Sequence, residues 1–252
     1  MLAIIGGTGL SQIDCFKAIG DELVQTPYAE TEVCIHRLRH GTSELVFLPR
    51  HGKGHVIPPH RINYRANIWA LRHVGVTHIV AVNAVGGIHP ELSPGMFAVP
   101  DQIIDYTSGR STTFFEDDLA SVQHIDFTKP YDERLRVRLM HACADQHAAD
   151  GTTVGVLAAG VYGCTDGPRL ETAAEIRRLR QDGCDMVGMT GMPEAALARE
   201  LDLAYASLVL SVNWAAGISA EPITLEKIHA ILDAGKHTVQ GVLQRLAAGD
   251  YA

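Results

Sequence analysis

The chain has 252 residues, of which 46% are hydrophobic and 20% charged, and a formal net charge of −8 at pH 7. This balance is ordinary for a globular protein and excludes a largely disordered chain. The acidic charge, without any run of lysine or arginine, disfavours binding to nucleic acid or to an anionic membrane surface. The length suffices for one large α/β domain, so we expect a single domain over residues 1–252.

The expected secondary structure alternates between short apolar runs, which predict strands, and amphipathic segments, which predict helices. In chain order we expect a strand over 2–5, a strand over 44–50, a helix over 63–74, a strand over 77–85, an irregular region over 106–131, a helix over 132–148, a strand over 152–162, a helix over 171–182, a strand over 184–189, a helix over 193–200, a strand over 204–212 and a helix over 224–246. Thr224 is the expected N-cap of the last helix. Alternating strands and helices predict an α/β fold with a mixed, mostly parallel sheet flanked by helices.

Five cysteines are scattered along the chain without a CxxC pair. An odd number at irregular positions is typical of reduced thiols in a reducing compartment. The N-terminal sequence MLAIIGGTGL lacks the basic flank of a signal peptide, and no apolar stretch approaches the roughly 20 residues that span a bilayer. We therefore expect a cytoplasmic protein without a membrane partner.

Polar and glycine residues follow several predicted strands, in the groups 6–9 (GGTG), Arg50-His51, 83–87 (NAVGG), Met189-Thr190 and Asn213-Trp214. Ligands of open α/β sheets bind at the carboxyl ends of the strands. Together these groups offer backbone N–H groups, hydroxyls, a guanidinium and an imidazole, which suit a phosphate. Each group also has a plainer interpretation as a turn or a solvated strand end. Neither the GxGxxG fingerprint nor the P-loop sequence occurs.

The thirteen histidines raise the question of a metal site. His36 and His40, and also His51 and His55, are four residues apart and would share one face of a helix. However, no HExxH sequence is present, and the proline and glycine residues of 51–60 argue against a helix there. We predict no metal site.

Five motifs together resemble the trimeric purine nucleoside phosphorylase family, and most closely its methylthioadenosine phosphorylase branch. They are IIGGTGL, LPRHGKGHVIPPHRINYRANIWAL, VNAVGGI, GCTDGPRLETAAEI and VGMTGMPEAALARE, and the resemblance extends from about residue 3 to about residue 235. The resemblance implies an α/β fold, a homotrimer, and phosphorolysis of a nucleoside to a free base and a ribose 1-phosphate. It implies no cofactor, since inorganic phosphate is a co-substrate.

The resemblance also implies roles for individual residues. The expected phosphate-binding residues are Thr8, Arg50, His51, Asn83, Ala84 (through its backbone) and Thr190. Met189 matches a residue that packs against the ribose. His124 matches a histidine that reaches into a neighbouring subunit's pocket, which would give the region 106–131 a function at an interface.

The base-reading positions distinguish two branches of the family. The adenine-using branch carries aspartates at the positions of Asn213 and Ala215, whereas the 6-oxopurine branch carries Asn at position 213 and Glu at position 171. This chain has both Glu171 and Asn213. We expect these two, with His51, to act in catalysis through preorganised electrostatics. The plainer roles are a favourable helix-dipole interaction for Glu171 and a turn for Asn213.

Other pocket positions concern the sugar and the face of the purine. Leu225 stands where inosine and guanosine phosphorylases carry a histidine for the 5′-hydroxyl, and so suits a methylthio group, although it could also be a core contact. His229, one helical turn later, could still supply a polar contact. Leu170 replaces a phenylalanine that relatives place against the purine, and Trp214 is expected to contact the substrate or to cap the core.

These positions together imply phosphorolysis of 5′-methylthioinosine to hypoxanthine and 5-methylthioribose 1-phosphate. The alternatives are a general inosine and guanosine phosphorylase, a methylthioadenosine phosphorylase, and a non-catalytic purine- or phosphate-binding protein.

Overall fold

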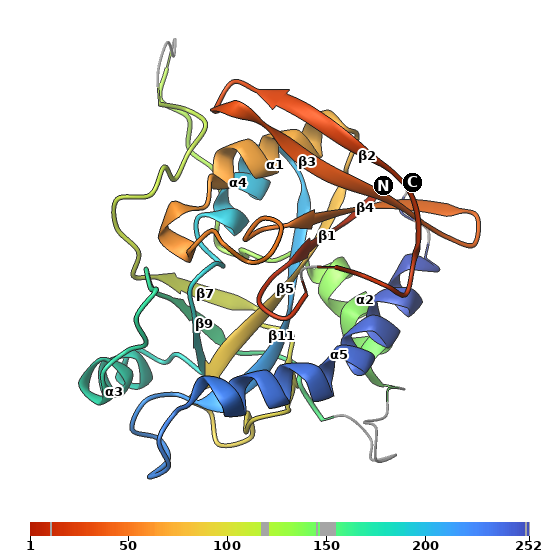
Figure 1. Cartoon of the computed structure of the whole chain (residues 1–252). Coiled ribbons are helices and arrows are strands. Elements are labelled where there is room, and N and C mark those ends of the chain that lie inside the picture. Colours follow the sequence, from red (N-terminus) through yellow and green to blue (C-terminus); the bar gives the residue numbers. More distant parts are fainter. Residues whose placement is uncertain (11, 117–120, 145, 147–154, 250, 252) are drawn as a thin grey trace.

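The computed structural model describes residues 1–10, 12–116, 121–144, 146, 155–249 and 251. Its centre is one eleven-stranded sheet surrounded by helices (Figure 1). The strands are β1 (Leu2–Gly6), β2 (Lys17–Thr26), β3 (Ala29–His40), β4 (Ser43–Pro49), β5 (His78–Gly87), β6 (Phe97–Ala98), β7 (Gln102–Asp105), β8 (Val156–Leu157), β9 (Val161–Cys164), β10 (Met186–Gly188) and β11 (Ala204–Trp214). The helices are the 3-10 turn η1 (Pro59–Arg61), α1 (Tyr64–His73), α2 (Glu133–Ala144), α3 (Ala173–Gln181), α4 (Glu194–Glu200) and α5 (Leu225–Ala247).

The sheet has the strand order β2-β3-β4-β1-β5-β10-β9-β7, and β11 pairs with β5 as well. The central strands β4, β1, β5 and β11 are parallel to their neighbours in this group, while the hairpin β2–β3 and the pair β5–β10 are antiparallel. This arrangement brings the carboxyl ends of β1 and β4 together beside the second half of β5. The peptide N–H of Arg50 donates to the carbonyl of Gly6 at 3.1 Å and ties the two strand ends to each other.

Alternating residues of the central strands build a core on each face of the sheet. In β1, Ala3 and Ile5 pack in one hydrophobic cluster with residues of α1 and α4, whereas Leu2 and Ile4 pack in another with residues of α2 and α5. Strands covered on both faces are near-continuously apolar, as the sequence of β1 is. The predicted class, a mixed and mostly parallel sheet flanked by helices, is confirmed. Among the described residues, none of the helices combines the length and apolarity needed to cross a membrane.

The largest element outside the sequence prediction is the β2–β3 hairpin, which lies at one edge of the sheet (Figure 1). Most side chains of β2 are exposed, and Val24 and Ile35 are among the few buried hydrophobic residues of the hairpin. A strand with so little buried surface carries no apolar run from which it could be predicted. The short strands β6 and β7 were likewise outside the predicted set, because two to four residues give no periodicity.

Several predicted boundaries need correction. The single strand predicted over 152–162 is wrong, because the structure has two short strands, β8 and β9, separated by residues 158–160. Residues 152–154 of that prediction, 145 and 147–148 of the predicted helix 132–148, and 117–120 of the region 106–131 lie outside the described residues. The helix predicted from residue 171 begins at Ala173, after the N-cap Thr172, whose side chain and Glu175 form a capping box. Glu171 therefore lies before the helix rather than in its first turn.

Strand β11 does not stop before Asn213. It continues through Trp214, paired with β5 as far as Gly87, and its register shifts between Ser211 and Asn213. Such irregularities bend a strand and redirect its side chains, and they are common beside functional sites. Asn213 is therefore a strand residue and not a turn residue. Thr224 caps α5 as predicted, since its side chain accepts from the peptide N–H of Lys227.

Candidate active site

A cavity of about 480 Å³ lies where β1, β4, β5, β10 and β11 converge. This volume is within the range of pockets that hold small organic ligands. The predicted site residues that line it are Thr8, Arg50, His51, Asn83, Ala84, Leu170, Glu171, Met189, Thr190, Asn213, Ala215 and Leu225. These residues are up to 217 positions apart in the sequence, and the strand order of the sheet brings them together.

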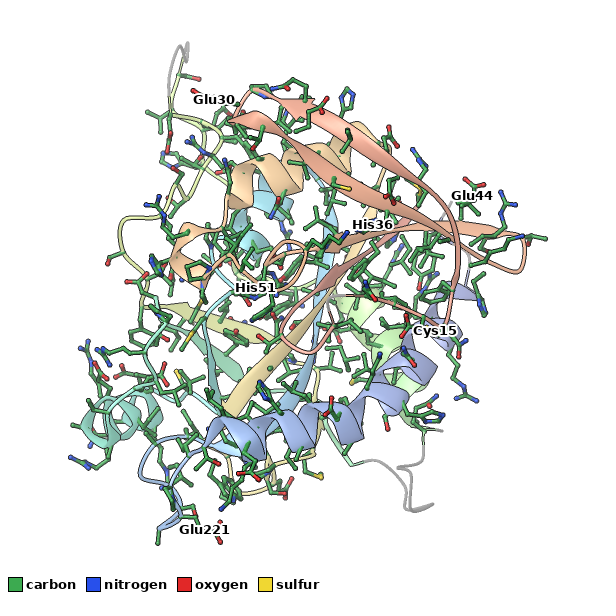
Figure 2. All side chains as sticks on the ribbon, in the orientation of Figure 1. Cys15, Glu30, His36, Glu44, His51 and Glu221 are labelled. Carbon is green, nitrogen blue, oxygen red and sulfur yellow. The ribbon has the colours of Figure 1, made fainter. Side chains whose placement is uncertain are left out.

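The loop after β4 is folded around His51. The Nδ1 atom of His51 lies 2.8 Å from the carbonyl oxygen of Ile57, and the peptide N–H of Ile57 donates to the carbonyl of His51 at 2.9 Å. A carbonyl can only accept, so the proton of the neutral ring is on Nδ1 and Nε2 is an acceptor. His51 is buried, and Figure 2 labels its position. The pKa of His51 is lowered to about 4, first by burial and then by Arg50, so the ring is neutral at pH 7.

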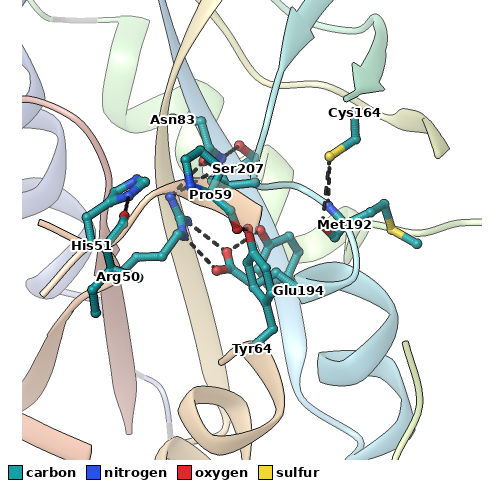
Figure 3. A network of polar contacts seen from close by, with 12 residues as sticks. Arg50, His51, Pro59, Tyr64, Asn83, Cys164, Met192, Glu194 and Ser207 are labelled. Carbon is teal, nitrogen blue, oxygen red and sulfur yellow. Dashed lines mark hydrogen bonds and ion pairs between the residues drawn. The ribbon is translucent and has the colours of Figure 1, made fainter. Parts of the chain in front are cut away.

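Arg50 follows β4 directly and its side chain is 1% exposed. Its Nε and Nη2 atoms donate to the two carboxylate oxygens of Glu194 at 2.7 and 2.8 Å, which is a bidentate ion pair (Figure 3). Burial acts to lower the pKa of Arg50, but the adjacent Glu194 outweighs it and the pKa is raised. The guanidinium is therefore charged at every physiological pH, and Glu194 balances that charge.

The remaining Arg50 nitrogen, Nη1, contacts two residues that line the cavity. It donates to Asn83 Oδ1 at 3.0 Å and to Thr190 Oγ1 at 3.2 Å. The Thr190 hydroxyl donates to the same Asn83 oxygen at 2.8 Å, and Asn83 Nδ2 donates to Ser207 Oγ at 2.7 Å (Figure 3). Asn83 is thus fixed from both ends of its amide, and it holds together residues from β5, β11 and the segment after β10.

The other part of the cavity carries the two predicted base readers. Thr165 Oγ1 donates to Glu171 Oε1 at 2.7 Å, which fixes one carboxylate oxygen. Asn213 Nδ2 donates to the carbonyl of Trp214 at 2.7 Å. Because a carbonyl only accepts, this contact identifies which atom of the Asn213 amide is the nitrogen. The contact uses one N–H of Nδ2 and does not involve Oδ1 or the other N–H.

The mouth of the cavity is apolar and open. Four of its lining residues are exposed hydrophobic side chains: Val56 (74%), Ile57 (36%), Leu170 (44%) and Leu225 (71%). We call these four residues the apolar rim. Exposed apolar groups gathered around a cavity are typical of a surface that a ligand or another protein covers.

Two predicted substrate contacts do not lie in this cavity. Trp214 lines a neighbouring cavity of about 330 Å³ with Pro222, Ile223 and Lys227, and Asn213 lines both cavities. A substrate contact for Trp214 stays a prediction, because Trp214 does not line the larger cavity itself. His124 is exposed and does not line the cavity of its own chain, so the proposed contact to a neighbouring subunit stays a prediction.

Three residues that hold the site were outside the sequence prediction: Thr165, Glu194 and Ser207. Thr165 lies within the motif GCTDGP, so its neighbourhood to Glu171 was visible in the sequence. Glu194 follows a proline at the start of α4, where an acidic residue is explained by the helix dipole alone. Its partner Arg50 is 144 residues away, and no local pattern predicts such a pair.

Within the described part of the chain, one group of side chains has the composition of a metal site, namely Asp21, Cys34 and His36 on the β2–β3 hairpin. His36 lies on β3 of this hairpin (Figure 2). His36 Nδ1 and Asp21 Oδ1 are 2.7 Å apart and already satisfy each other, and the Asp21 side chain is 63% exposed. The candidate active site contains none of the three residues.

Comparison with known proteins places the chain in a family. Residues 1–248 match the model of the phosphorylase superfamily. A protein of Pseudomonas syringae pv. tomato, named probable S-methyl-5′-thioinosine phosphorylase, is 53% identical over 244 residues, with 97% of each chain covered. The 6-oxopurine nucleoside phosphorylase of Pyrococcus furiosus is 45% identical, with 90% of this chain and 84% of that protein covered.

A solved structure agrees with these matches. Methylthioadenosine phosphorylase from Schistosoma mansoni, in complex with adenine, superposes with a TM-score of 0.91 and 33% identity, covering 98% of this chain and 90% of that chain. The match to the family model spans all the elements that line the cavity. The chain belongs to the phosphorylase superfamily.

Proposed function

We propose that the protein catalyses phosphorolysis of 5′-methylthioinosine, which yields hypoxanthine and 5-methylthioribose 1-phosphate. The observation that carries the proposal is the presence of Glu171 and Asn213 in one cavity with Arg50, His51 and Thr190. The first two suit a 6-oxopurine and the others suit a phosphate. Relatives that are 53% and 46% identical are named probable S-methyl-5′-thioinosine phosphorylases, which supports the same substrate.

The base preference follows from hydrogen-bond chemistry. Hypoxanthine offers O6 as an acceptor and N1–H as a donor, whereas adenine offers an amine donor and N1 as an acceptor. In the proposed complex Asn213 donates to O6 and accepts from N7–H of the leaving base, and an ionised Glu171 accepts from N1–H. Thr165 occupies one oxygen of Glu171, and the other is available for the base. A site built on such contacts can reject the wrong partner by roughly 10⁴-fold.

The phosphate is held by the Gly7–Thr8 loop, Arg50 and Thr190 in the proposed complex. Because His51 Nδ1 bonds to Ile57, Nε2 is free to accept the O–H of hydrogen phosphate. The bond between the sugar C1′ and the base nitrogen breaks, and its electron pair leaves with the purine. A phosphate oxygen then bonds to C1′, and the proton that hydrogen phosphate loses is taken up by the purine anion at N7. The site contributes by orienting phosphate and base and by stabilising charge, and no covalent enzyme intermediate or cofactor is required.

The 5′ substituent is assigned to Leu225 and Ile228 at the start of α5, which line the cavity. A methylthio group covers apolar surface there, and each methylene-sized unit that is buried contributes about 0.8 kcal/mol. The 71% exposure of Leu225 supports a ligand-contacting role over a core role.

One observation favours a second candidate, a general 6-oxopurine nucleoside phosphorylase. His229 also lines the cavity and could bind a 5′-hydroxyl. Two relatives that are 43% and 45% identical are named probable 6-oxopurine and 6-oxopurine nucleoside phosphorylases. The two candidates share the base readers and differ only in the preferred 5′ group.

We further propose a homotrimer in which a neighbouring copy completes each active site. Its support is the apolar rim, together with the exposed Val122 (74%) and Ile125 (36%) beside His124 in the region 106–131. An apolar segment of one copy on the rim of another would cover both surfaces and bring His124 near the sugar. A cytoplasmic location, the remaining proposal, is supported by five cysteines that are all free thiols.

The test is a comparison of kcat/KM for phosphate-dependent cleavage of methylthioinosine, methylthioadenosine and inosine. The proposal expects the highest value for methylthioinosine. A higher value for methylthioadenosine would contradict the base assignment, and a higher value for inosine would support the second candidate. Release of no base from any nucleoside, with or without phosphate, would instead support a non-catalytic binding protein.

A further inference from the structure

The four hydrogen bonds of the Arg50 guanidinium go to three residues, which lie on two sides of it. Nε and Nη2 face Glu194, at 2.7 and 2.8 Å, and Nη1 faces Asn83 and Thr190 at the cavity. Figure 3 shows this division, with the carboxylate on one side of the guanidinium and the amide on the other. Since the guanidinium is planar and rigid, the carboxylate that grips one edge determines where Nη1 points.

Glu194 is itself fixed and shielded. Its side chain is 1% exposed and does not line the cavity, so it contacts no ligand there. The hydroxyl of Tyr205, in β11, donates to Glu194 Oε1 at 2.8 Å, and this oxygen also accepts from Arg50 Nη2. A buried carboxylate with three donors around it has one favourable position, and a bidentate pair restricts rotation as well as distance.

We propose that Glu194 is a positioning residue for phosphate: it aims Arg50 Nη1 at the anion, and Tyr205 holds Glu194 in place. This inference rests on the proposed function in so far as the cavity takes phosphate. Without the carboxylate, the guanidinium would lose its restraint on two nitrogens, while Asn83 and Thr190 would hold it only through Nη1. Arg50 would then meet the phosphate in several orientations instead of one.

A purely structural ion pair predicts a different outcome. Buried pairs often contribute little net stability, and removing one partner destabilises the fold because a charge is left unpaired. Such a role would lower stability and the amount of active protein without changing the affinity of folded protein for either substrate. A positioning role raises the KM for phosphate and leaves the KM for the nucleoside unchanged, because Glu194 lies behind the phosphate-binding residues and not beside the base readers.

The test uses two variants and a matched control. Glu194→Gln keeps the shape but removes the charge and one acceptor, and Tyr205→Phe removes one hydrogen bond and keeps the ion pair. Tyr131→Phe is the control, because Tyr131 is buried, its ring stacks on that of Tyr205 at 6.0 Å, and within the described part of the chain its hydroxyl has no hydrogen-bond partner. The KM for phosphate and for methylthioinosine is measured, and binding of inorganic phosphate alone is measured by calorimetry without nucleoside.

We expect the KM and the dissociation constant for phosphate to rise about tenfold or more in Glu194→Gln, which loses hydrogen bonds between charged groups. In Tyr205→Phe, which loses one hydrogen bond from a neutral hydroxyl, we expect both constants to rise about threefold. The KM for the nucleoside and all constants of Tyr131→Phe should stay within about twofold of the parent protein. Unchanged phosphate constants in folded Glu194→Gln would overturn the inference. If that variant does not fold, phosphate constants of Tyr205→Phe equal to those of Tyr131→Phe would overturn it. Absence of phosphate binding by the parent protein would refute the proposed function instead, so the two failures are distinguishable.

Discussion

The contact between Asn213 and the Trp214 carbonyl makes Asn213→Asp a sensitive test of base recognition. In the native protein Asn213 Nδ2 donates to that carbonyl at 2.7 Å. A carboxylate in the same rotamer would place oxygen against oxygen at this distance, so the new carboxyl group must either be protonated, with a raised pKa, or rotate away. It also has no N–H for O6 of hypoxanthine when it is ionised.

Each of these two effects costs about 1–3 kcal/mol, the range for a buried polar group that loses its partner. Together they predict a fall in kcat/KM for methylthioinosine of about 30-fold to 10⁴-fold. Since the new carboxyl group can donate to the Trp214 carbonyl only while it is protonated, the residual activity should decline as pH rises through its pKa.

The assay is phosphate-dependent hypoxanthine release between pH 5 and 9, with Asn67→Asp, a change in α1 that does not face the cavity, as the control. The control should keep the parent kcat/KM and pH profile. The reasoning is refuted if Asn213→Asp keeps kcat/KM for methylthioinosine within about threefold of the parent protein, well below the expected loss.

Three further predictions concern other parts of the site. Leu225→His should lower the ratio of kcat/KM for methylthioinosine to kcat/KM for inosine by about tenfold, because about two methylene-sized units lose an apolar contact. An unchanged ratio would show that the 5′ group does not contact Leu225. Gly7→Ala should weaken phosphate binding and lower the free energy of unfolding by about 1–3 kcal/mol. The reason is that the added Cβ would lie 2.5 Å from the carbonyl oxygen of Val82 and 3.2 Å from Arg50 Nη1. If phosphate affinity and the free energy of unfolding both equal those of the parent protein, this close approach is contradicted. Burial, and then Arg50, lower the pKa of His51 from 6.5 to about 4. The unfolded chain therefore takes up the proton first, and the free energy of unfolding should fall by up to about 3 kcal/mol as pH drops from about 6.5 towards 4. Denaturant titrations at several pH values should show that the free energy of unfolding of His51→Asn depends less steeply on pH, and an equal dependence would contradict the assignment.

The sequence was sufficient to predict the parts of the site that follow strands. Arg50 and His51 come directly after an apolar strand, and the parallel arrangement of β1, β4 and β5 brings their ends together in any fold of this class. The amphipathic period likewise predicted α1 and α5, each with a start one residue before the observed one. These predictions depend on local patterns, which a sequence contains in full.

The parts that were missed or wrong depend on pairing between distant segments. Glu194 was missed because its partner Arg50 is distant in the chain, and the β2–β3 hairpin because it buries few side chains. Trp214 was assigned to the cavity because the strand was expected to end before it. In the structure β11 continues beside β5 to Gly87, and Trp214 lines only the neighbouring cavity whereas Asn213 lines both.

The central claim is that this cavity selects a 6-oxopurine over adenine. The most direct measurement is a competition in which equal concentrations of methylthioinosine and methylthioadenosine react with phosphate in one vessel, and the released hypoxanthine and adenine are separated and quantified. The initial ratio of the two bases equals the ratio of the two kcat/KM values. Glu171 and Asn213 predict an excess of hypoxanthine of at least about a hundredfold. Equal release, or an excess of adenine, would contradict the account.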